Sequence, residues 1–478
     1  MVEEEDDRRR KRVKVAEEDD VEGEKNTYEL AKDENESLVT QEALYLETID
    51  RKRLDFDFEK LCSVSLNNNN VYGCLTCGSY FQGRGKSSHA YLHSVDCDHH
   101  VFINLHTLKI YVLPEGYEVK SAVLDDIKYV VDPYYSKEYV ESLDTTPREA
   151  YDLSRRLYWP GYIGINNLKA NDYSNVIIQL LVHIPPLRDH LMLNKDKYSD
   201  EMIRRFSTLI RKVWNPKAFK PHVSPHELLQ HIAVISKKKF RPIEQADPFM
   251  FMNWFLNQIH LGLGGSKTKP KSSLVQQIFQ GKMRIESQKI TASAVPGDRL
   301  RFEADTKVQV NDTRFLFLTL DLPPTPLFKD DIEGNVIPQI SLTELLKKYD
   351  GSTTQELAGE RKRYKILELP QYLVLVVKRF AKLGVIEDRN PTVVRFDPRA
   401  LNMTHFLEDT DSDVVYSLVG NVVYELNKTN QGDKHSWKAQ VLDRSRQTWL
   451  QIQDLIVEQV RAELLFLSES YIQVWQRN

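Results

Sequence analysis

The sequence predicts an α+β protein in which a small metal-binding module precedes a larger domain. All four cysteines lie within residues 62–97, beside a group of histidines. Beyond this region, apolar residues first follow a helical period, as in 173–184, and later form strand-like runs, as in 315–322 and 372–377. Helices followed by strands predict an α+β fold with segregated layers.

Composition limits the classes of protein that fit. The chain has 478 residues, of which 41% are hydrophobic and 28% are charged, and its net charge is −4. This charge gives no overall attraction for nucleic acid. The chain has no apolar run of about 18 residues and begins with charged residues, so we expect neither a transmembrane helix nor a secretory signal. Clustered cysteines favour a reducing compartment and a metal site over disulfides.

The first forty residues alternate in charge, with acidic blocks at 3–7 and 17–20 around a basic block at 8–14. Such a segment is expected to be disordered. The basic block has the form of a nuclear import signal, and the alternative is a solvated charge run. The sequence predicts a charged tail, a zinc module, a linker and a larger domain, at 1–40, 41–140, 141–158 and 159–478 respectively.

The elements of the larger domain follow in order. A helix is expected over 173–184, where Pro185 and Pro186 stop it. A second helix is expected over 250–259, followed by the glycine- and lysine-rich loop 262–270. Alternating and apolar runs then predict strands at 315–322, 372–377, 416–419 and 471–475.

The cysteines and histidines have metal-ligand spacing. Cys74 and Cys77 form a CxxC pair whose thiolates can close on one tetrahedral ion. His89 and His93, four residues apart, would share a helix face, and His99 follows before a strand. The alternative is that the histidines are surface residues and the cysteines belong to the core. The combination of CxxC with several histidines favours a zinc site.

The stretch 74–113 resembles the zinc finger of ubiquitin carboxyl-terminal hydrolases (UBP type). The resemblance implies a structural Zn²⁺ bound by Cys74, Cys77, His93 and His99. A second site of the family retains only Cys62 and His89, with Ser65 and Gln82 in place of two cysteines. A hydroxyl and an amide replace thiolates poorly, so we expect one zinc ion. Cys97 matches no ligand.

In other proteins, this finger type captures the free C-terminus of ubiquitin with an arginine and aromatic residues. Arg84, Tyr72 and Tyr111 stand at equivalent places, whereas Leu113 replaces a tyrosine. The resemblance therefore leaves ubiquitin binding by this finger open.

Residues 164–179 resemble the nucleophile box of ubiquitin-specific proteases, whose fold is papain-like. Asp172 stands in place of the nucleophilic cysteine, and Ala170 replaces the asparagine that supports the oxyanion. Lys169 replaces a glycine. Because aspartate is a good helix N-cap, Asp172 has a structural explanation. A carboxylate nucleophile would need a mixed anhydride formed from a stable amide, which argues against a catalytic role.

The later family boxes are present but altered. Residues 245–252 resemble a helix box of the family, and residues 369–380 resemble a strand box. In the histidine box, an alignment on Trp437 and Ala439 places Ser436 at the base position, with His435 one residue away on the other strand face. Gln453 replaces the orienting Asn or Asp. Since nucleophile, base, orienter and oxyanion donor have all changed, the resemblance implies a pseudoenzyme.

This combination resembles the inactive ubiquitin-specific-protease-like proteins of the spliceosome, the snRNP-assembly-defective family. The resemblance implies a nuclear, non-catalytic pre-mRNA splicing factor that supports the U4/U6.U5 tri-snRNP as a protein-binding scaffold. Its expected partners are tri-snRNP proteins, with snRNA and ubiquitin as further candidates and no membrane. The alternatives are a ubiquitin-binding adaptor or a residual deubiquitinase outside splicing. The basic stretches 236–241 and 267–271 are candidate docking surfaces or solvated loops.

Overall fold

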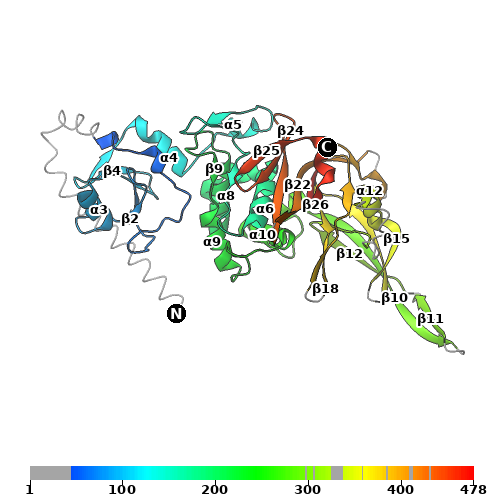
Figure 1. Ribbon diagram of the computed structural model, residues 1–478. Helices are drawn as coiled ribbons and strands as arrows, with labels where there is room; N and C mark the ends of the chain where they lie inside the picture. The colour runs from blue at the N-terminus through cyan, green and yellow to red at the C-terminus, as the bar shows by residue number, and fades with distance from the viewer. Residues whose placement is uncertain are drawn as a thin grey trace, which may run out of the picture. The chain divides into compact units, whose positions relative to one another are not determined.

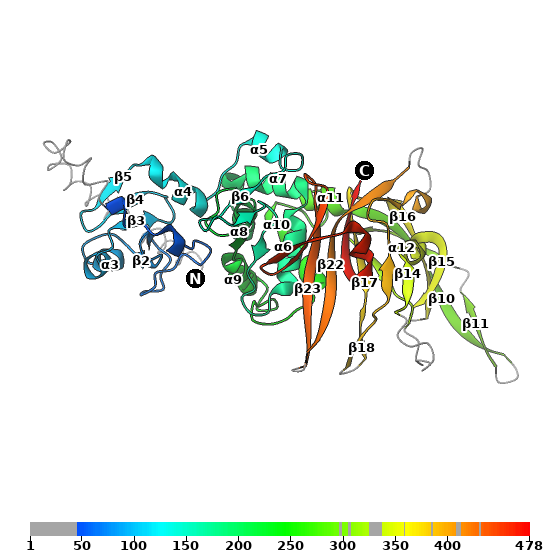
Figure 2. The ribbon, with the colours of Figure 1, turned by 45° about the horizontal axis from the view of Figure 1, so that its top comes forward.

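The computed structural model describes residues 45–295, 299–304, 307–324, 337–357, 359–383, 386–407, 413–429 and 432–478. The chain forms two compact units, Met1–Asp132 and Pro133–Asn478 (Figures 1 and 2). The charged tail 1–40, with its basic block at 8–14, lies outside the described residues. The import signal therefore stays a prediction.

The N-terminal unit is built on one antiparallel sheet. The sheet has the order β2 (Tyr80–Gln82), β1 (Val71–Cys74), β3 (Val101–Asn104), β4 (Ile110–Val112) and β5 (Tyr117–Val119). Helix α3 (His89–Cys97) begins after Ser88, whose Oγ accepts a hydrogen bond from the Tyr91 amide, and ends at Asp98 in the left-handed region. Helix α4 (Asp125–Val131) follows β5.

The first half of the C-terminal unit is helical, as the sequence predicts. Pro185 and Pro186 end one helix but also begin the next, because proline fits the first turn of a helix. The helices are α5 (Lys137–Glu141), α6 (Asp172–Val182), α7 (Pro185–Leu193), α8 (Glu201–Val213), α9 (His226–Ile235), α10 (Pro248–Gly262) and α11 (Leu274–Phe279). No single described helix is both long and apolar enough to cross a membrane.

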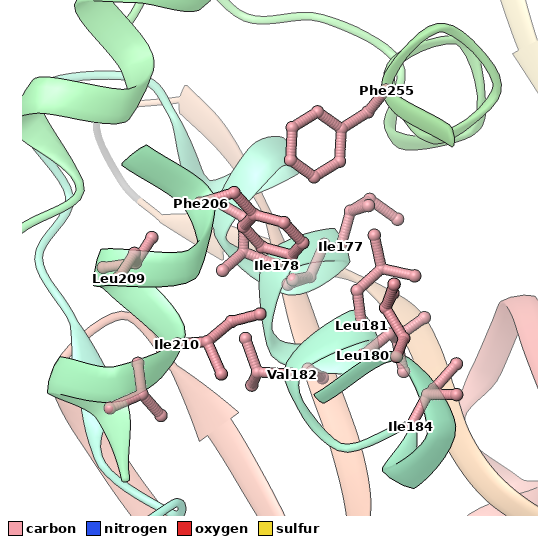
Figure 3. Close-up of a cluster of buried hydrophobic side chains, with 14 of the residues drawn as sticks. Ile177, Ile178, Leu180, Leu181, Val182, Ile184, Phe206, Leu209, Ile210 and Phe255 are labelled. Atoms are coloured by element: carbon pink, nitrogen blue, oxygen red, sulfur yellow. The ribbon is translucent and has the colours of Figure 1, made fainter. Parts of the chain in front are cut away.

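Helix α6 is the centre of this half, and all eleven of its residues are buried. Phe206 of α8 and Phe255 of α10 point toward its apolar side chains (Figure 3). Burial of each large apolar side chain contributes roughly 1.5–3 kcal/mol. Gly420 permits close approach of α6 to the sheet, because a Cβ there would lie 2.4 Å from Leu180 Cδ2. Helix α6 is therefore packed along its whole length.

The second half of the unit is dominated by an eight-stranded mixed sheet (Figure 2). One face packs on the helices and the other covers a second apolar core that includes Leu375 and Trp475. The order is β13 (Leu318–Asp321), β17 (Tyr372–Lys378), β26 (Glu469–Arg477), β22 (Val415–Thr429), β23 (Gly432–Asp443), β24 (Thr448–Gln453) and β25 (Ile456–Val460), with β21 (Leu401–Asn402) beside β22. Four of these strands coincide with the runs predicted from sequence.

A five-stranded sheet extends from this core (Figure 1). It consists of β11 (Arg299–Ala304), β10 (Gly281–Val295), β16 (Glu360–Glu368) and β15 (Asp350–Leu357), with β12 (Gln309–Phe315) beside β10. Helix α12 (Leu342–Leu346) packs in the second core. Two-stranded pairs complete the unit: β6 (Ala150–Tyr151) with β7 (Leu157–Tyr158), β8 (Gly164–Ile165) with β9 (His222–Val223), β14 (Gln339–Ser341) with β20 (Val393–Arg395), and β18 (Phe380–Leu383) with β19 (Ile386–Arg389).

The segment 133–158, which includes the expected linker, belongs to the C-terminal unit. The Arg188 guanidinium donates to both carboxylate oxygens of Asp144 at 2.9 and 2.8 Å. Tyr135 donates its hydroxyl to the Arg211 carbonyl at 2.6 Å. These contacts explain why this segment folds with the larger unit instead of acting as a free spacer.

Candidate metal centre and the Asp172 site

The N-terminal unit brings together the four predicted zinc ligands. One ligand atom from each of Cys74, Cys77, His93 and His99 lies within 4.8 Å of the others. Cys74 ends β1, and the Gly78 amide donates to the Cys74 carbonyl at 2.9 Å, which closes a tight turn around Cys77. His93 comes from α3 and His99 from the turn before β3. Separate elements thus converge on one point.

The geometry of these atoms suits zinc. Cys77 Sγ lies 3.4 Å from His93 Nε2, Cys74 Sγ lies 3.6 Å from His99 Nδ1, and the two ring nitrogens are 3.0 Å apart. Bonds of about 2.0–2.3 Å around a tetrahedral ion give ligand separations of about 3.3–3.8 Å. Both sulfur–nitrogen separations lie in this range, and the two ring nitrogens lie slightly closer than it. The hydrogen bond between the two thiols lowers the pKa of Cys77 and raises the pKa of Cys74, because the pair shares one proton when no ion is bound. The residues fit a closed structural zinc site.

The remnant of the second family site is a hydrogen-bonded cluster. Ser65 Oγ donates to Gln82 Oε1 at 2.9 Å, and the Ser65 amide donates to Cys62 Sγ at 3.4 Å. Burial would raise the pKa of the Cys62 thiol, but hydrogen bonds from Ser65 outweigh it and lower that pKa. Among the described residues, the Cys74 cluster is the only group of three or more His, Cys, Asp or Glu side chains arranged for a metal. Cys97 is exposed at the end of α3.

Three of the four residues compared with the ubiquitin-tail pocket lie together. The Arg84 guanidinium lies 4.4 Å from the centroid of the Tyr111 ring and donates to the Gly116 carbonyl at 3.3 Å. The rings of Tyr72 and Tyr111 meet edge to face at 6.0 Å. Leu113 is fully buried. The arginine–tyrosine stack is present without the additional hydroxyl that a tyrosine at 113 would supply.

Asp172 begins α6 in the C-terminal unit, but it is not the N-cap. Asn171 occupies the N-cap position and Asp172 is the first helical residue, so the expectation of an N-cap was wrong by one residue. The Asn171 side chain accepts from the Leu168 amide at 2.6 Å and donates to Asn175 Oδ1 at 2.8 Å, which stabilises the loop before the helix.

The Asp172 carboxylate is buried, with 4% of its surface exposed, and both oxygens accept hydrogen bonds. Oδ1 accepts from Gln245 Nε2 at 2.8 Å and from the Tyr173 amide at 2.9 Å. Oδ2 accepts from the Trp437 amide at 3.3 Å. Gln245 precedes α10 and Trp437 lies on β23, so this carboxylate links three elements.

The other altered positions supply no partner for a nucleophile. Ala170 donates its amide to the Pro242 carbonyl and has no polar side chain. Strand alternation places His435 on the same strand face as Trp437. His435 is exposed, and its ring stacks on that of Tyr424 with the centroids 6.2 Å apart. Ser436 lies on the opposite face, and its buried Oγ has no hydrogen-bond partner among the described residues. Gln453 ends β24.

Asp454 is a residue of this site that sequence reasoning missed. It accepts hydrogen bonds from Asn167 Nδ2 at 3.0 Å and Asn175 Nδ2 at 3.2 Å, and its carbonyl accepts from the Ile165 amide. Burial raises the pKa of Asp454, and the charge of Asp172 adds to that increase. The signal available in the sequence was an acidic residue directly after Gln453, the position compared with the orienting residue of the family.

Aromatic residues fill the space beside Asp172. The Trp437 ring centroid lies 5.0 Å from that of Tyr471 and 5.1 Å from that of Tyr424. Phe380 contacts all three rings. Tyr471 donates its hydroxyl to Asp247 Oδ2 at 2.6 Å, which ties the sheet to the N-terminus of α10. The site therefore consists of a satisfied carboxylate against packed aromatic rings. No imidazole in the described part of the chain hydrogen-bonds to it.

Comparison with known proteins defines the class. Residues 163–475 match the family model of ubiquitin carboxyl-terminal hydrolases, and residues 62–124 match that of the zinc finger in ubiquitin hydrolases and other proteins. The chain therefore belongs to the ubiquitin carboxyl-terminal hydrolase family, with a zinc finger of that family preceding the hydrolase fold. The α+β fold and the order of the two domains are confirmed.

Within this family, the chain is similar to splicing proteins. It is 47% identical over 459 residues to the probable mRNA-splicing protein ubp10 of Schizosaccharomyces pombe. The aligned region covers 94% of this chain and 91% of that protein. It is 34% identical to the pre-mRNA-splicing factor SAD1 of Saccharomyces cerevisiae, over 94% and 97% of the two chains. The crystal structure of an essential yeast splicing factor matches with a TM-score of 0.74 and 34% identity, over 91% and 100% of the chains. These relatives confirm the resemblance of the chain to the spliceosomal members of the ubiquitin carboxyl-terminal hydrolase family.

Proposed function

We propose that this chain is a non-catalytic pre-mRNA splicing factor of the nucleus that supports assembly or stability of the U4/U6.U5 tri-snRNP. Similarity to a splicing protein over 94% of the chain supports the process. The family resemblance of the sequence supports the tri-snRNP as the particle. The chain would act by binding snRNP proteins.

The hydrogen bonding of the Asp172 carboxylate is the observation that supports a non-catalytic role for the chain. Hydrolysis of an isopeptide by this fold needs a nucleophile, a base that takes its proton and a donor for the oxyanion. Position 172 holds a carboxylate whose two oxygens accept hydrogen bonds from Gln245, Tyr173 and Trp437. No cysteine occurs after position 97. The carboxylate serves as a structural acceptor.

The zinc finger contributes a folded module with one structural ion at Cys74, Cys77, His93 and His99. The donor set and its separations support this assignment. The ion would lend folding free energy to a unit whose own core is small.

Depletion and rescue in splicing extract test the function. Removal of the protein should lower the tri-snRNP fraction on a gradient and reduce splicing of a reporter transcript. The wild type and Asp172→Ala should restore both to the same extent. A folded Asp172→Ala protein that fails to rescue would contradict a non-catalytic role. Wild-type protein that does not restore the tri-snRNP would contradict the proposed particle.

A second candidate function is ubiquitin binding by the zinc finger, favoured by the stack of Arg84 on Tyr111. Titration with free ubiquitin tests it, with ubiquitin lacking its C-terminal Gly-Gly as the control. Binding that depends on the Gly-Gly and disappears in Arg84→Ala would support the adaptor reading. Equal weak responses to both ubiquitin forms would contradict it.

A further inference from the structure

A group of cations borders the Asp172 site, and we call it the lysine cluster: Lys169, Lys237, Lys238, Lys239 and Arg241. The four lysines are exposed. Two chain segments form the cluster, and they are joined where the Ala170 amide donates to the Pro242 carbonyl at 3.0 Å. The cluster is thus a surface and not a single loop.

The charge of the lysine cluster is largely uncompensated. Arg241 pairs with Glu244 at 2.5 Å. Glu244 is the one carboxylate within residues 236–245. Lys169, Lys237 and Lys238 form no ion pair with any residue that the structure describes. The two segments of the cluster therefore carry more positive than negative charge, since Glu244 pairs with Arg241 and leaves the lysines without a salt-bridge partner among the described residues.

Two lysines of the cluster have a backbone conformation that is unfavourable for residues with a Cβ atom. Lys237 and Lys238 have φ values of 53° and 65°, both in the left-handed region. Their amides donate to the Val234 and Ala233 carbonyls at 3.1 and 2.8 Å, which ends α9. Glycine is the usual residue in this position, since a Cβ is strained there. The two exposed lysines strain the helix end and, among the described residues, gain no side-chain hydrogen bond or ion pair in return, so folding alone does not explain them.

The neighbours of the cluster indicate the chemistry of the partner. Val234 and Ile243 are 73% and 54% exposed. The aromatic residue of the segment, Phe240, is buried. Single-stranded nucleic acid is usually held by exposed aromatic rings that stack on bases. An aliphatic surface among lysines instead fits a protein segment that carries both carboxylates and apolar side chains.

We propose that the lysine cluster, with Val234 and Ile243, is the docking surface for an acidic protein segment that carries apolar residues. This inference rests on the proposed function, because it names the surface through which the scaffold would bind a splicing partner. The partner contacts the rim of the former catalytic site rather than its interior.

Binding of two labelled probes to the full chain tests the surface. One probe is a synthetic peptide of glutamates with leucines at helical spacing, and the other is a uridine-rich RNA of equal charge. The test variant is Lys237→Gly with Lys238→Gly. Glycine relieves the left-handed strain, so the melting temperature should hold or rise while peptide affinity falls by about tenfold at low salt. The matched control, Lys86→Gly with Lys120→Gly, removes two exposed charges from the N-terminal unit and should leave peptide affinity unchanged.

Three outcomes overturn the proposal: RNA binding through these lysines without peptide binding, equal peptide affinity in both variants, or no peptide binding. Co-sedimentation of the full chain with tri-snRNP from nuclear extract separates this proposal from the function. If the wild type and the 237/238 variant co-sediment equally, the docking surface is wrong and the function stands. If the wild type does not co-sediment with the tri-snRNP, the proposed function is contradicted.

Discussion

Gln245 donates a hydrogen bond from Nε2 to Asp172 Oδ1 at 2.8 Å, across 73 residues of sequence. Both residues belong to segments that resemble catalytic boxes of ubiquitin-specific proteases. Here the pair connects the loop before α10 to the start of α6, and Trp437 adds β23 from the other side. A position where the family carries a nucleophile has become a joint between helices and sheet.

Removal of this joint should destabilise the fold. Asp172→Ala leaves the buried Trp437 amide without its acceptor, whereas Gln245 is exposed and can turn toward water. An unsatisfied buried donor costs about 1–3 kcal/mol, so urea unfolding should show a loss of that order. The exposed control Asp196→Ala should change stability by less than about 0.5 kcal/mol. Equal stability of both variants would show that the hydrogen bonds at Asp172 contribute nothing net.

Restoring a thiol should not restore catalysis. Asp172→Cys places a cysteine at the start of α6, but Ala170 still lacks an amide side chain and Ser436 still lies on the opposite strand face from Trp437. The variant should neither cleave ubiquitin conjugates nor label with ubiquitin bearing a thiol-reactive C-terminus. The wild type, without a cysteine in this unit, is the matched control. Turnover by either protein would mean that another group supplies base and oxyanion support.

The zinc finger should bind one ion per chain, measured by elemental analysis of the purified protein. Structural zinc contributes folding free energy on the order of 10 kcal/mol in small modules. Cys74→Ser should therefore unfold the N-terminal unit and leave the C-terminal unit intact in limited proteolysis. Cys62→Ser should keep the zinc, since Cys62 lies in the separate cluster with Ser65. Two ions per chain, or none, would contradict the single-site assignment.

Much of the fold could be predicted because its signals are local. The apolar face of 173–184 and the runs at 372–377 and 471–475 carry the period of their elements. The cluster of Cys74, Cys77, His93 and His99 could also be predicted, because CxxC and histidine spacing encode a small metal-binding group within one short segment. The pairing of β17 with β26 joins residues about one hundred positions apart and is beyond local pattern.

The hydrogen bonds around Asp172 and Asp454 join residues that are far apart in the sequence. Nothing near Asp454 in sequence indicates that Asn167 and Asn175 donate to it. The N-cap assignment failed by one residue because Asn171 and Asp172 are both good capping residues. Burial and the long-range amides of Gln245 and Trp437, not capping, explain the aspartate. The sequence resemblance suggests which positions are altered, whereas the structure shows which residues bind the Asp172 carboxylate.

His183, at the end of α6, should make stability depend on pH. Its ring is 6% exposed and stacks on Tyr162 at 4.7 Å, with Nδ1 donating to the Gln179 carbonyl at 2.6 Å. Burial lowers the pKa of His183 to about 4 from 6.5, and the charge of Arg188 adds to this. Between those values the unfolded chain binds more protons than the native state. Stability is therefore lost as pH falls from about 6.5 to about 4, by roughly 3 kcal/mol.

His183→Phe keeps the stacked ring and removes the titration. Urea unfolding across this pH range should show a flatter profile for His183→Phe than for the wild type, whatever the shift in absolute stability. The exposed His405→Phe is the control and should retain the wild-type slope. Parallel profiles for His183→Phe and the wild type would mean that the buried imidazole does not stay neutral in the native state.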